Sequence, residues 1–226
     1  MSDRIVHIIG NGDSHNFYKP SKGFKLTCNL PPREIANVFA TCIVDFKMCK
    51  ALDDGEVNLD SFEWVMGARP KKYMEMKPDF YMRNAPRIKE FYTVLPKYAA
   101  NYTDFNCGHF AVYYAAHKLK ADVIHMYGFD SNFDFNLNSV SDFSLNSDRG
   151  GANNLRLADN WRPIWQQIFR EWKNVKFVMH HVHDKLKINK DDNVEVVVYD
   201  RKNIKTDLTK GRPSQVKASF DQVSEA

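Results

Sequence analysis

The stretch Ile5-Val6-His7-Ile8-Ile9-Gly10-Asn11-Gly12-Asp13-Ser14 joins an apolar run to a glycine-rich turn. A short apolar run that ends in such a turn is typical of a buried strand. The two glycines allow the backbone to approach a ligand closely, and Asn11, Ser14 and nearby backbone N–H groups can donate to a phosphate or a ribose. We therefore predict a nucleotide-binding site at the carboxyl end of this strand. A plain turn is the alternative, because the third glycine of the dinucleotide-binding fingerprint is absent.

Predicted strands and helices alternate along the rest of the chain. Apolar runs predict a strand that ends at Cys28-Asn29 and further strands over 37–45, 123–127, 175–179 and 194–199, while helical patterns cover 108–120 and 161–172. This alternation predicts an α/β fold, a single Rossmann-like doubly wound parallel sheet in one domain over 1–205. Residues 206–226 are expected to form a polar tail.

The region 52–101 does not follow this alternation. Prolines at positions 70, 78, 86 and 96 exclude a single long helix there. We expect short elements wrapped around the core, forming a lid or an insertion.

The composition excludes several classes of protein. A chain of 226 residues is long enough for one large domain. No apolar stretch approaches the roughly 20 residues that a membrane-spanning helix needs, and the first residues do not resemble a signal peptide, so we expect a cytoplasmic protein. The four cysteines lack paired C-x-x-C spacing, which favours reduced thiols over a disulfide framework or a zinc site: Cys28, Cys42, Cys49 and Cys107.

Basic residues gather between positions 66 and 97, although the net charge of the whole chain is only +4. Tyrosines and phenylalanines are interleaved with these cations, so the segment could contact a polyanion such as duplex DNA. The alternative is a solvated surface whose aromatic rings pack inward. The cations are Arg69, Lys71, Lys72, Lys77, Arg83, Arg87, Lys89 and Lys97.

Four motifs resemble, in order and spacing, those of the bacterial lipooligosaccharide sialyltransferases of glycosyltransferase family 42. That family has a G-N-G-P-S turn, a C-N pair, a T-S-G helix start and a strand that ends in S-G-I-D. The similarity covers roughly residues 4–184. The matching residues here are Gly10-Asn11-Gly12-Asp13-Ser14, Cys28-Asn29, Asn106-Cys107-Gly108 and Tyr127-Gly128-Phe129-Asp130.

The resemblance implies a Rossmann-like domain of the GT-A-variant type that binds a cytidine-monophosphate sugar and needs no metal. It implies that Asn11, Gly12 and Ser14 approach the phosphate and that Asn29 meets the base or the ribose. The resemblance also implies that residues of the third and fourth motifs surround the nucleoside. These residues are Asn106, Cys107, Gly108, Gly128 and Asp130.

All of these positions fall at predicted strand ends or at a helix N-terminus, where open α/β sheets bind ligands. Asp45 ends the predicted strand 37–45 and adds a carboxylate there. The sequence departs from the family in three places. Asp13 replaces the proline of the first turn, Asp104 replaces an arginine, and no histidine between 131 and 160 matches the family's base.

Inverting sugar transfer needs a base that takes the proton from the acceptor hydroxyl. His181 and His183 follow the predicted strand 175–179, and they would share one face if that strand continued through them. Structural histidines are the alternative. A metal would need further ligands, and no matching carboxylate or cysteine spacing accompanies the pair, so we assign none.

Three other residues are candidates for the chemistry. His15 and Asp148 are further possible bases, and Arg149, beside Gly150-Gly151, could hold the phosphate of the leaving group.

The acceptor is predicted only from analogy. The compact chain resembles small phage-encoded glycosyltransferases that add a pentose, such as arabinose, or a hexose to hydroxymethylated cytosines in DNA, which would place it in a host cytoplasm. A glycan-directed enzyme like the sialyltransferases is an alternative. Two non-catalytic alternatives are a nucleotide sensor and a nucleic-acid-binding protein.

Overall fold

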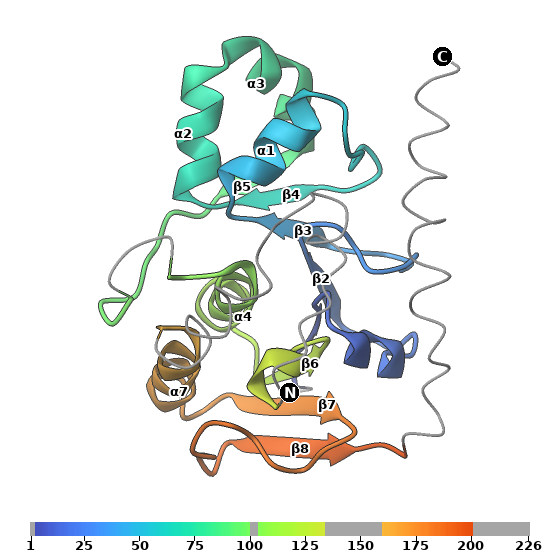
Figure 1. The fold of residues 1–226 in the computed structure, drawn as a ribbon, viewed down its shortest axis with the longest axis vertical. Coiled ribbons are helices and arrows are strands. Elements are labelled where there is room, and N and C mark those ends of the chain that lie inside the picture. The colour runs from blue at the N-terminus through green and yellow to red at the C-terminus, as the bar shows by residue number, and fades with distance from the viewer. Residues whose placement is uncertain (1–2, 100–103, 134–159, 201–226) are drawn as a thin grey trace.

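The computed structural model describes residues 3–99, 104–133 and 160–200. These residues form one all-parallel sheet of eight strands, in the order β5-β4-β3-β2-β1-β6-β7-β8 (Figure 1). The strands are β1 (Ile5–Ile9), β2 (Phe24–Cys28), β3 (Ala40–Ile43), β4 (Trp64–Met66), β5 (Ile88–Phe91), β6 (Val123–Tyr127), β7 (Lys176–His181) and β8 (Val194–Val198). The predicted α/β fold with a Rossmann-like, doubly wound sheet is confirmed.

Helices connect most of these parallel strands. The α-helices are α1 (Phe46–Asp53), α2 (Ala68–Met76), α3 (Pro78–Asn84), α4 (Cys107–His117) and α7 (Arg162–Glu171). Three short 3₁₀ helices follow strand ends or helices: η1 (Asp13–Phe17), η2 (Ala85–Arg87) and η3 (Asp130–Asn132).

The strand order reverses between β1 and β6. From β1 the chain builds outward through β2 to β5, and it then returns to place β6 on the other side of β1. The two central strands pair in register, with Ile9 opposite Tyr127 at their carboxyl ends. In doubly wound sheets this reversal leaves a crevice between the two loops that leave the central strands.

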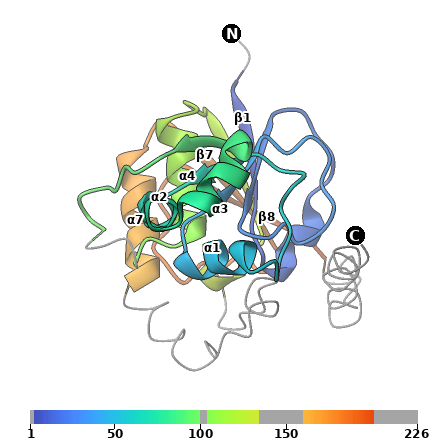
Figure 2. The same ribbon diagram turned by 90° about the horizontal axis from the view of Figure 1, so that it is seen from above.

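Side chains alternate between the two faces of the sheet, and each face has its own core. On one face, Val6 and Ile8 of β1 pack with Ile124 of β6 beneath α4 and α7. On the other face, Ile43 and Trp64 pack against α1, α2 and α3. Figure 2 views the molecule from the β5 end, with these three helices nearest the reader.

Local sequence explains where α4 begins. Asn106 precedes the helix, and its side chain accepts the backbone N–H of His109 at 3.0 Å, while Nδ1 of His109 accepts the backbone N–H of Asn106 at 3.2 Å. This reciprocal pair satisfies two donors of the first turn. Residues from Cys107 to Ala116 are almost all buried, so α4 is a core helix.

The region 52–101 differs from the predicted lid or insertion. It contributes β4 and β5, which extend the sheet by two parallel strands, as well as α2 and α3. β4 has three residues and β5 has four, and neither shows a run long enough for periodicity to reveal a strand. The predicted tail 206–226 lies outside the described residues.

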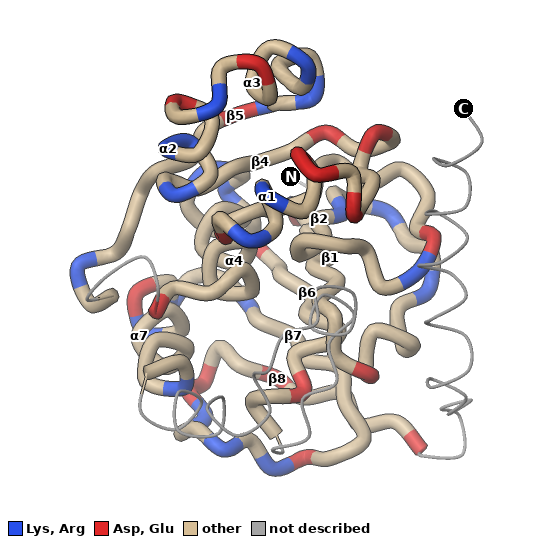
Figure 3. Tube along the Cα trace, turned by 45° about the horizontal axis from the view of Figure 1, so that its top comes forward, with Lys and Arg blue, Asp and Glu red and all other residues tan. Residues whose placement is uncertain are grey.

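Most cations of the segment 66–97 are paired with carboxylates. Arg69 pairs with Asp45 at 3.1 Å and Arg83 pairs with Asp53 at 2.7 Å. Further ion pairs join Lys71 to Glu75, Arg87 to Asp60 and Lys89 to Glu63. Figure 3 shows acidic and basic residues interleaved along α2 and α3, so this surface is less cationic than its lysines and arginines alone suggest.

Some predicted boundaries shift by a few residues. The strand predicted over 37–45 is shorter, because Asn37 has a φ of 56° and the strand begins only at Ala40. The helix predicted over 108–120 ends at His117. Among the described residues, no helix is long and apolar enough to cross a lipid bilayer.

Candidate functional site

The loops that follow β1 and β6 are joined directly by hydrogen bonds. The backbone N–H of Gly10 donates to the carbonyl of Tyr127 at 2.7 Å, and that of Gly12 donates to Gly128 at 3.0 Å. A Cβ on Gly12 would lie 2.6 Å from Oδ2 of Asp130, and Gly128 has a φ of +76°. The glycines of the first turn are therefore required for the packing of one loop on the other.

Asp130 lies at the centre of this contact. Its Oδ2 accepts the backbone N–H of Ser14 at 3.1 Å, and its Oδ1 accepts the Ser14 hydroxyl. The same hydroxyl oxygen accepts the backbone N–H of Gly128 at 2.9 Å. The donors of Ser14 that were predicted to face a phosphate are thus used by a carboxylate. A carboxylate repels a phosphate but accepts the hydrogens of a ribose hydroxyl.

His181 is the last residue of β7 and faces Asp130. Its Nε2 lies 3.5 Å from Oδ1 of Asp130, and its Nδ1 accepts the backbone N–H of His183 at 3.0 Å. Phe133 stacks on its imidazole with ring centres 3.9 Å apart. Because Nδ1 accepts a hydrogen bond, it carries no proton, so His181 is neutral with its proton on Nε2. In this geometry the Nε2–H of His181 is directed at Asp130.

His183 does not continue the strand. β7 ends at His181, and the chain turns so that the two imidazole rings lie 5.2 Å apart. The condition under which both would share one strand face is therefore not met, and the backbone N–H of His183 donates to the His181 ring instead. His183 is half-buried, whereas His181 is buried, so His183 is the more accessible of the two.

His15 is close to the same loops. Its side chain is buried, and Nδ1 lies 2.8 Å from the carbonyl oxygen of Gly12. A carbonyl only accepts, so Nδ1 of His15 carries a proton. Asp148 and Arg149, the other two candidates, lie outside the described residues.

Asn11 and Asn29 extend the site toward β2. Asn11 Nδ2 donates to the carbonyl of Cys28 at 2.9 Å. Asn29 follows directly, with a φ of 54°, and its backbone N–H donates to Cys42 at 2.8 Å. Oδ1 of Asn29 is buried and has no hydrogen-bond partner among the described residues. A buried amide oxygen without a partner is costly, and a donor on a ligand would remove that cost.

The residues at the start of α4 hold the helix against the sheet. The Cys107 thiol donates to the carbonyl of Cys42 at 2.9 Å, and complete burial raises its pKa. A Cβ on Gly108 would lie 2.9 Å from the Phe129 ring. Oδ1 of Asn106 and the thiol of Cys107 are thus used internally.

Asp45 lies apart from this group. It lies between β3 and α1, and β2 separates β3 from β1 in the sheet. Its carboxylate pairs with Arg69. The fold therefore brings Ser14 of the first motif and Asp130 of the fourth motif together with His15 and His181. Asp45 follows β3, two strands away from β1.

Two residues that the sequence analysis did not select belong to the same place. Phe133 stacks on His181. Asn132 is fully buried, and neither its side-chain oxygen nor its nitrogen has a partner among the described residues. Both follow Asp130 in the turn after β6, and that position was the only signal in the sequence.

A second group of histidines lies on the neighbouring strands β1, β6 and β7. His7 and His125 are opposite each other in β1 and β6 and stack at 4.9 Å, and Nδ1 of His125 lies 2.9 Å from Nε2 of His180 in β7. Burial, with the charge of the neighbouring histidines, lowers the pKa of His125 and of His180 to about 4. Burial also lowers the pKa of His7. These histidines are neutral near pH 7 and pack the sheet face.

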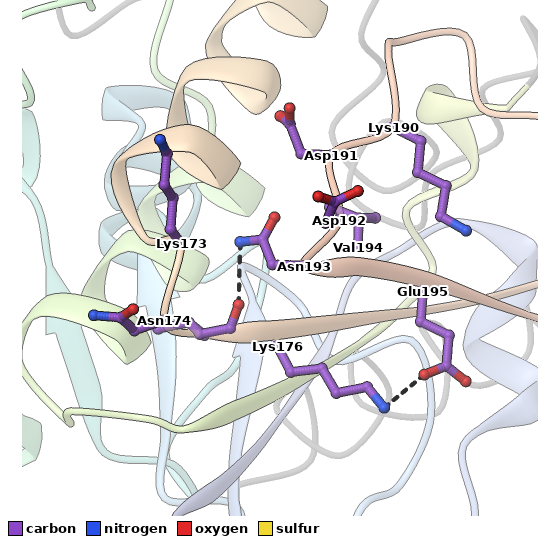
Figure 4. A pocket seen from close by; sticks show the side chains of 10 residues that line it. Lys173, Asn174, Lys176, Lys190, Asp191, Asp192, Asn193, Val194 and Glu195 are labelled. Carbon is purple, nitrogen blue, oxygen red and sulfur yellow. Dashed lines mark hydrogen bonds and ion pairs between the residues drawn. The ribbon is translucent and has the colours of Figure 1, made fainter.

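Figure 4 shows a broad hollow of about 720 Å³ at the amino ends of β7 and β8. Lys176 and Glu195 form an ion pair at 2.6 Å across it, and the lining has three lysines and three carboxylates. It lies at the opposite end of β7 from His181, and its charges balance. It is therefore separate from the site around Asp130.

Among the described residues, no group of three histidine, cysteine or acidic side chains is arranged to hold a metal ion. The sequence matches no protein-family model, and comparison with curated proteins and with solved structures gives no significant match. The structure thus defines a class: an α/β protein with a Rossmann-like sheet whose polar side chains gather where the strand order reverses.

Proposed function

We propose that this protein is a glycosyltransferase that moves a sugar from a nucleotide-sugar donor to an acceptor hydroxyl. One observation carries the proposal. Asp130, held by Ser14 and His181, lies at the reversal of strand order, where sheets of this class bind nucleotides. The four motifs that resemble those of family 42 support a CMP-sugar as donor, with a UDP-sugar as the alternative.

The contacts of the site suggest how a nucleotide would bind. The Asp130 carboxylate would accept hydrogens from ribose hydroxyls. Oδ1 of Asn29 would accept a hydrogen from an exocyclic amine of the base, which cytosine has and uracil lacks. The phosphate would then lie away from Asp130, because two negative groups at close range repel each other.

The transfer itself needs a base and a leaving group. The base takes the proton of the acceptor hydroxyl, the new bond forms between that oxygen and the anomeric carbon, and the bond to the phosphate oxygen breaks. His183 and His15 are the candidate bases that we favour, since both ring nitrogens of His181 are engaged, Nδ1 by the backbone N–H of His183 and Nε2 by Asp130.

We further propose hydroxymethylated cytosine in DNA as the acceptor. Ion pairs occupy five cations of the segment 66–97. Lys72 and Lys77 are exposed and have no carboxylate partner among the described residues, and Tyr81 and Met82 beside them are exposed as well. Lysines beside exposed apolar side chains suit contact with phosphates and with an unstacked base.

The donor is tested by calorimetry and thermal shift with CMP, UDP, GDP and ADP, without added metal. Selective binding of CMP raises the melting temperature by mass action. Asn29→Ala should weaken this binding at least tenfold, and Asn174→Ala, at the other end of the sheet, should leave it unchanged. If none of the four nucleotides binds, the proposal of a nucleotide-sugar transferase is wrong.

The acceptor is tested separately by binding of duplex DNA at low salt. Charge reversal in Lys72→Glu with Lys77→Glu should abolish binding, whereas reversal of Lys173 and Lys190 at the opposite end should not. Equal loss in both double variants would show that only the net charge matters.

A further inference from the structure

A second hollow, of about 500 Å³, lies between the start of α7 and the connection from β7 to β8. Arg162 and Lys187 contribute positive charge to its lining, and Gln166 and Asn189 contribute amide groups. The remaining lining is apolar, and none of the described residues that line the hollow is acidic. This composition contrasts with the balanced charges of the hollow in Figure 4.

Two residues that line the hollow are hydrogen-bonded to η3. Arg162 is 7% exposed, and its Nε and Nη2 donate to the carbonyl of Ser131 at 3.2 Å and 2.9 Å. The backbone N–H of Lys187 donates to the carbonyl of Asn132 at 2.7 Å. One wall of the hollow is therefore tied to the turn that carries Asp130.

Buried side-chain atoms near the hollow lack hydrogen-bond partners among the described residues, and such atoms are expected where a ligand supplies the missing partner. Nε2 of Gln166 is buried and has no hydrogen-bond acceptor among the described residues. Asn132, whose backbone carbonyl accepts the N–H of Lys187, is fully buried, and neither end of its side-chain amide has a partner among the described residues. Trp161, which precedes α7, makes no side-chain hydrogen bond to the first turn of the helix.

We propose that this hollow binds a small molecule that bears a phosphate group. Phosphate oxygens accept hydrogen bonds in several directions, which suits a lining that combines Lys187 of the β7–β8 connection with Arg162 and Gln166 of α7. Pro163, Leu186 and Ile188 provide apolar contact for the rest of the ligand. A bound ligand would also immobilise η3, and through it Asp130.

The experiment is calorimetric titration of the full chain with inorganic pyrophosphate at low ionic strength without metal, and with citrate in a parallel arm. Pyrophosphate should bind the unmodified protein. Lys187→Gln should weaken binding at least tenfold, and Gln166→Glu, which adds a carboxylate to the lining, should weaken it further. The control Lys185→Gln removes an exposed lysine that does not line the hollow, and its binding should stay within twofold.

Three outcomes would overturn the proposal. They are the absence of pyrophosphate binding, equal binding by Lys187→Gln and Lys185→Gln, and binding of citrate alone. Thermal melts of each variant verify that it is folded. The inference does not depend on the proposed sugar transfer: Asn29→Ala should keep pyrophosphate binding, and failure of the nucleotides to bind would leave this hollow unaffected.

Discussion

His181 and Asp130 face each other across the ends of β7 and β6, with Nε2 of the histidine 3.5 Å from Oδ1 of the carboxylate. The other ring nitrogen accepts the backbone N–H of His183, so the histidine is neutral and directs its only N–H at Asp130. Asp130 in turn accepts two donors of Ser14. One buried carboxylate thus joins three segments of the chain.

The two buried histidines near this carboxylate should carry their protons on opposite nitrogens. His15 donates from Nδ1 to Gly12, and His181 accepts at Nδ1 from His183. Long-range ¹⁵N–¹H correlation spectra at pH 7.5 should show the Nδ1–H form for His15 and the Nε2–H form for His181. The same form in both residues would contradict the arrangement described.

Asp130→Asn should destabilise the protein even without a ligand. The change removes the charge from the acceptor of both Ser14 donors, and hydrogen bonds to a buried charged group contribute about 1.5–3 kcal/mol. Urea denaturation should show a loss of this order. Asp79→Asn, at an exposed position of α3, is the matched control and should change stability by less than about 0.5 kcal/mol.

Gly128→Ala should be far more damaging than Gly55→Ala. Both glycines have positive φ, +76° and +74°, so both variants incur the left-handed backbone cost of about 1–2 kcal/mol. A Cβ at position 128 would lie 2.5 Å from the carbonyl oxygen of Gly10, whereas nothing lies within 4 Å of one at position 55. The difference in unfolding free energy between the variants therefore measures the contact between the β1 and β6 loops. Equal losses would show that the loops can separate at no cost.

The protein should lose stability as the pH falls from about 6.5 to about 4. The pKa of His125 and of His180 is about 4 in the folded protein and near 6.5 when unfolded, so the unfolded state binds more protons in this range. The histidines therefore stabilise the fold fully above pH 6.5, and that contribution disappears as the pH approaches 4. The free energy of unfolding is expected to fall by on the order of 2–4 kcal/mol. This is less than the full value that the two pKa shifts would give, because His125 is partly exposed.

The His180→Phe variant tests the source of this pH dependence. Phenylalanine keeps a planar ring against Tyr127 but cannot be protonated. Its unfolding free energy, measured by urea at pH 7.5 and pH 4.5, should fall less between these values than that of the unmodified protein. An unchanged slope would place the acid sensitivity elsewhere.

The amino-acid sequence by itself determined the local elements and the class of fold. Runs such as Ile5–Ile9 and Val123–Tyr127 are largely apolar and mostly buried, and the glycine turn after the first run marks where that strand ends. Such signals reside in neighbouring residues, so the alternation of strands and helices could be predicted. The three-residue β4 has too little periodicity to be detected, so the extension of the sheet through 52–101 could not.

The contacts of the candidate site were decided only by the tertiary structure. Ser14 and Asp130 are 116 positions apart, and they meet because the strand order places β6 beside β1. The tautomer of His181 depends on where the chain turns after β7, and the pairing of Arg69 with Asp45 depends on where the fold places the first turn of α2 relative to the start of α1. Long-range hydrogen bonds and ion pairs depend on the folded path of the chain. The order of residue types along the sequence does not show which two distant residues will meet.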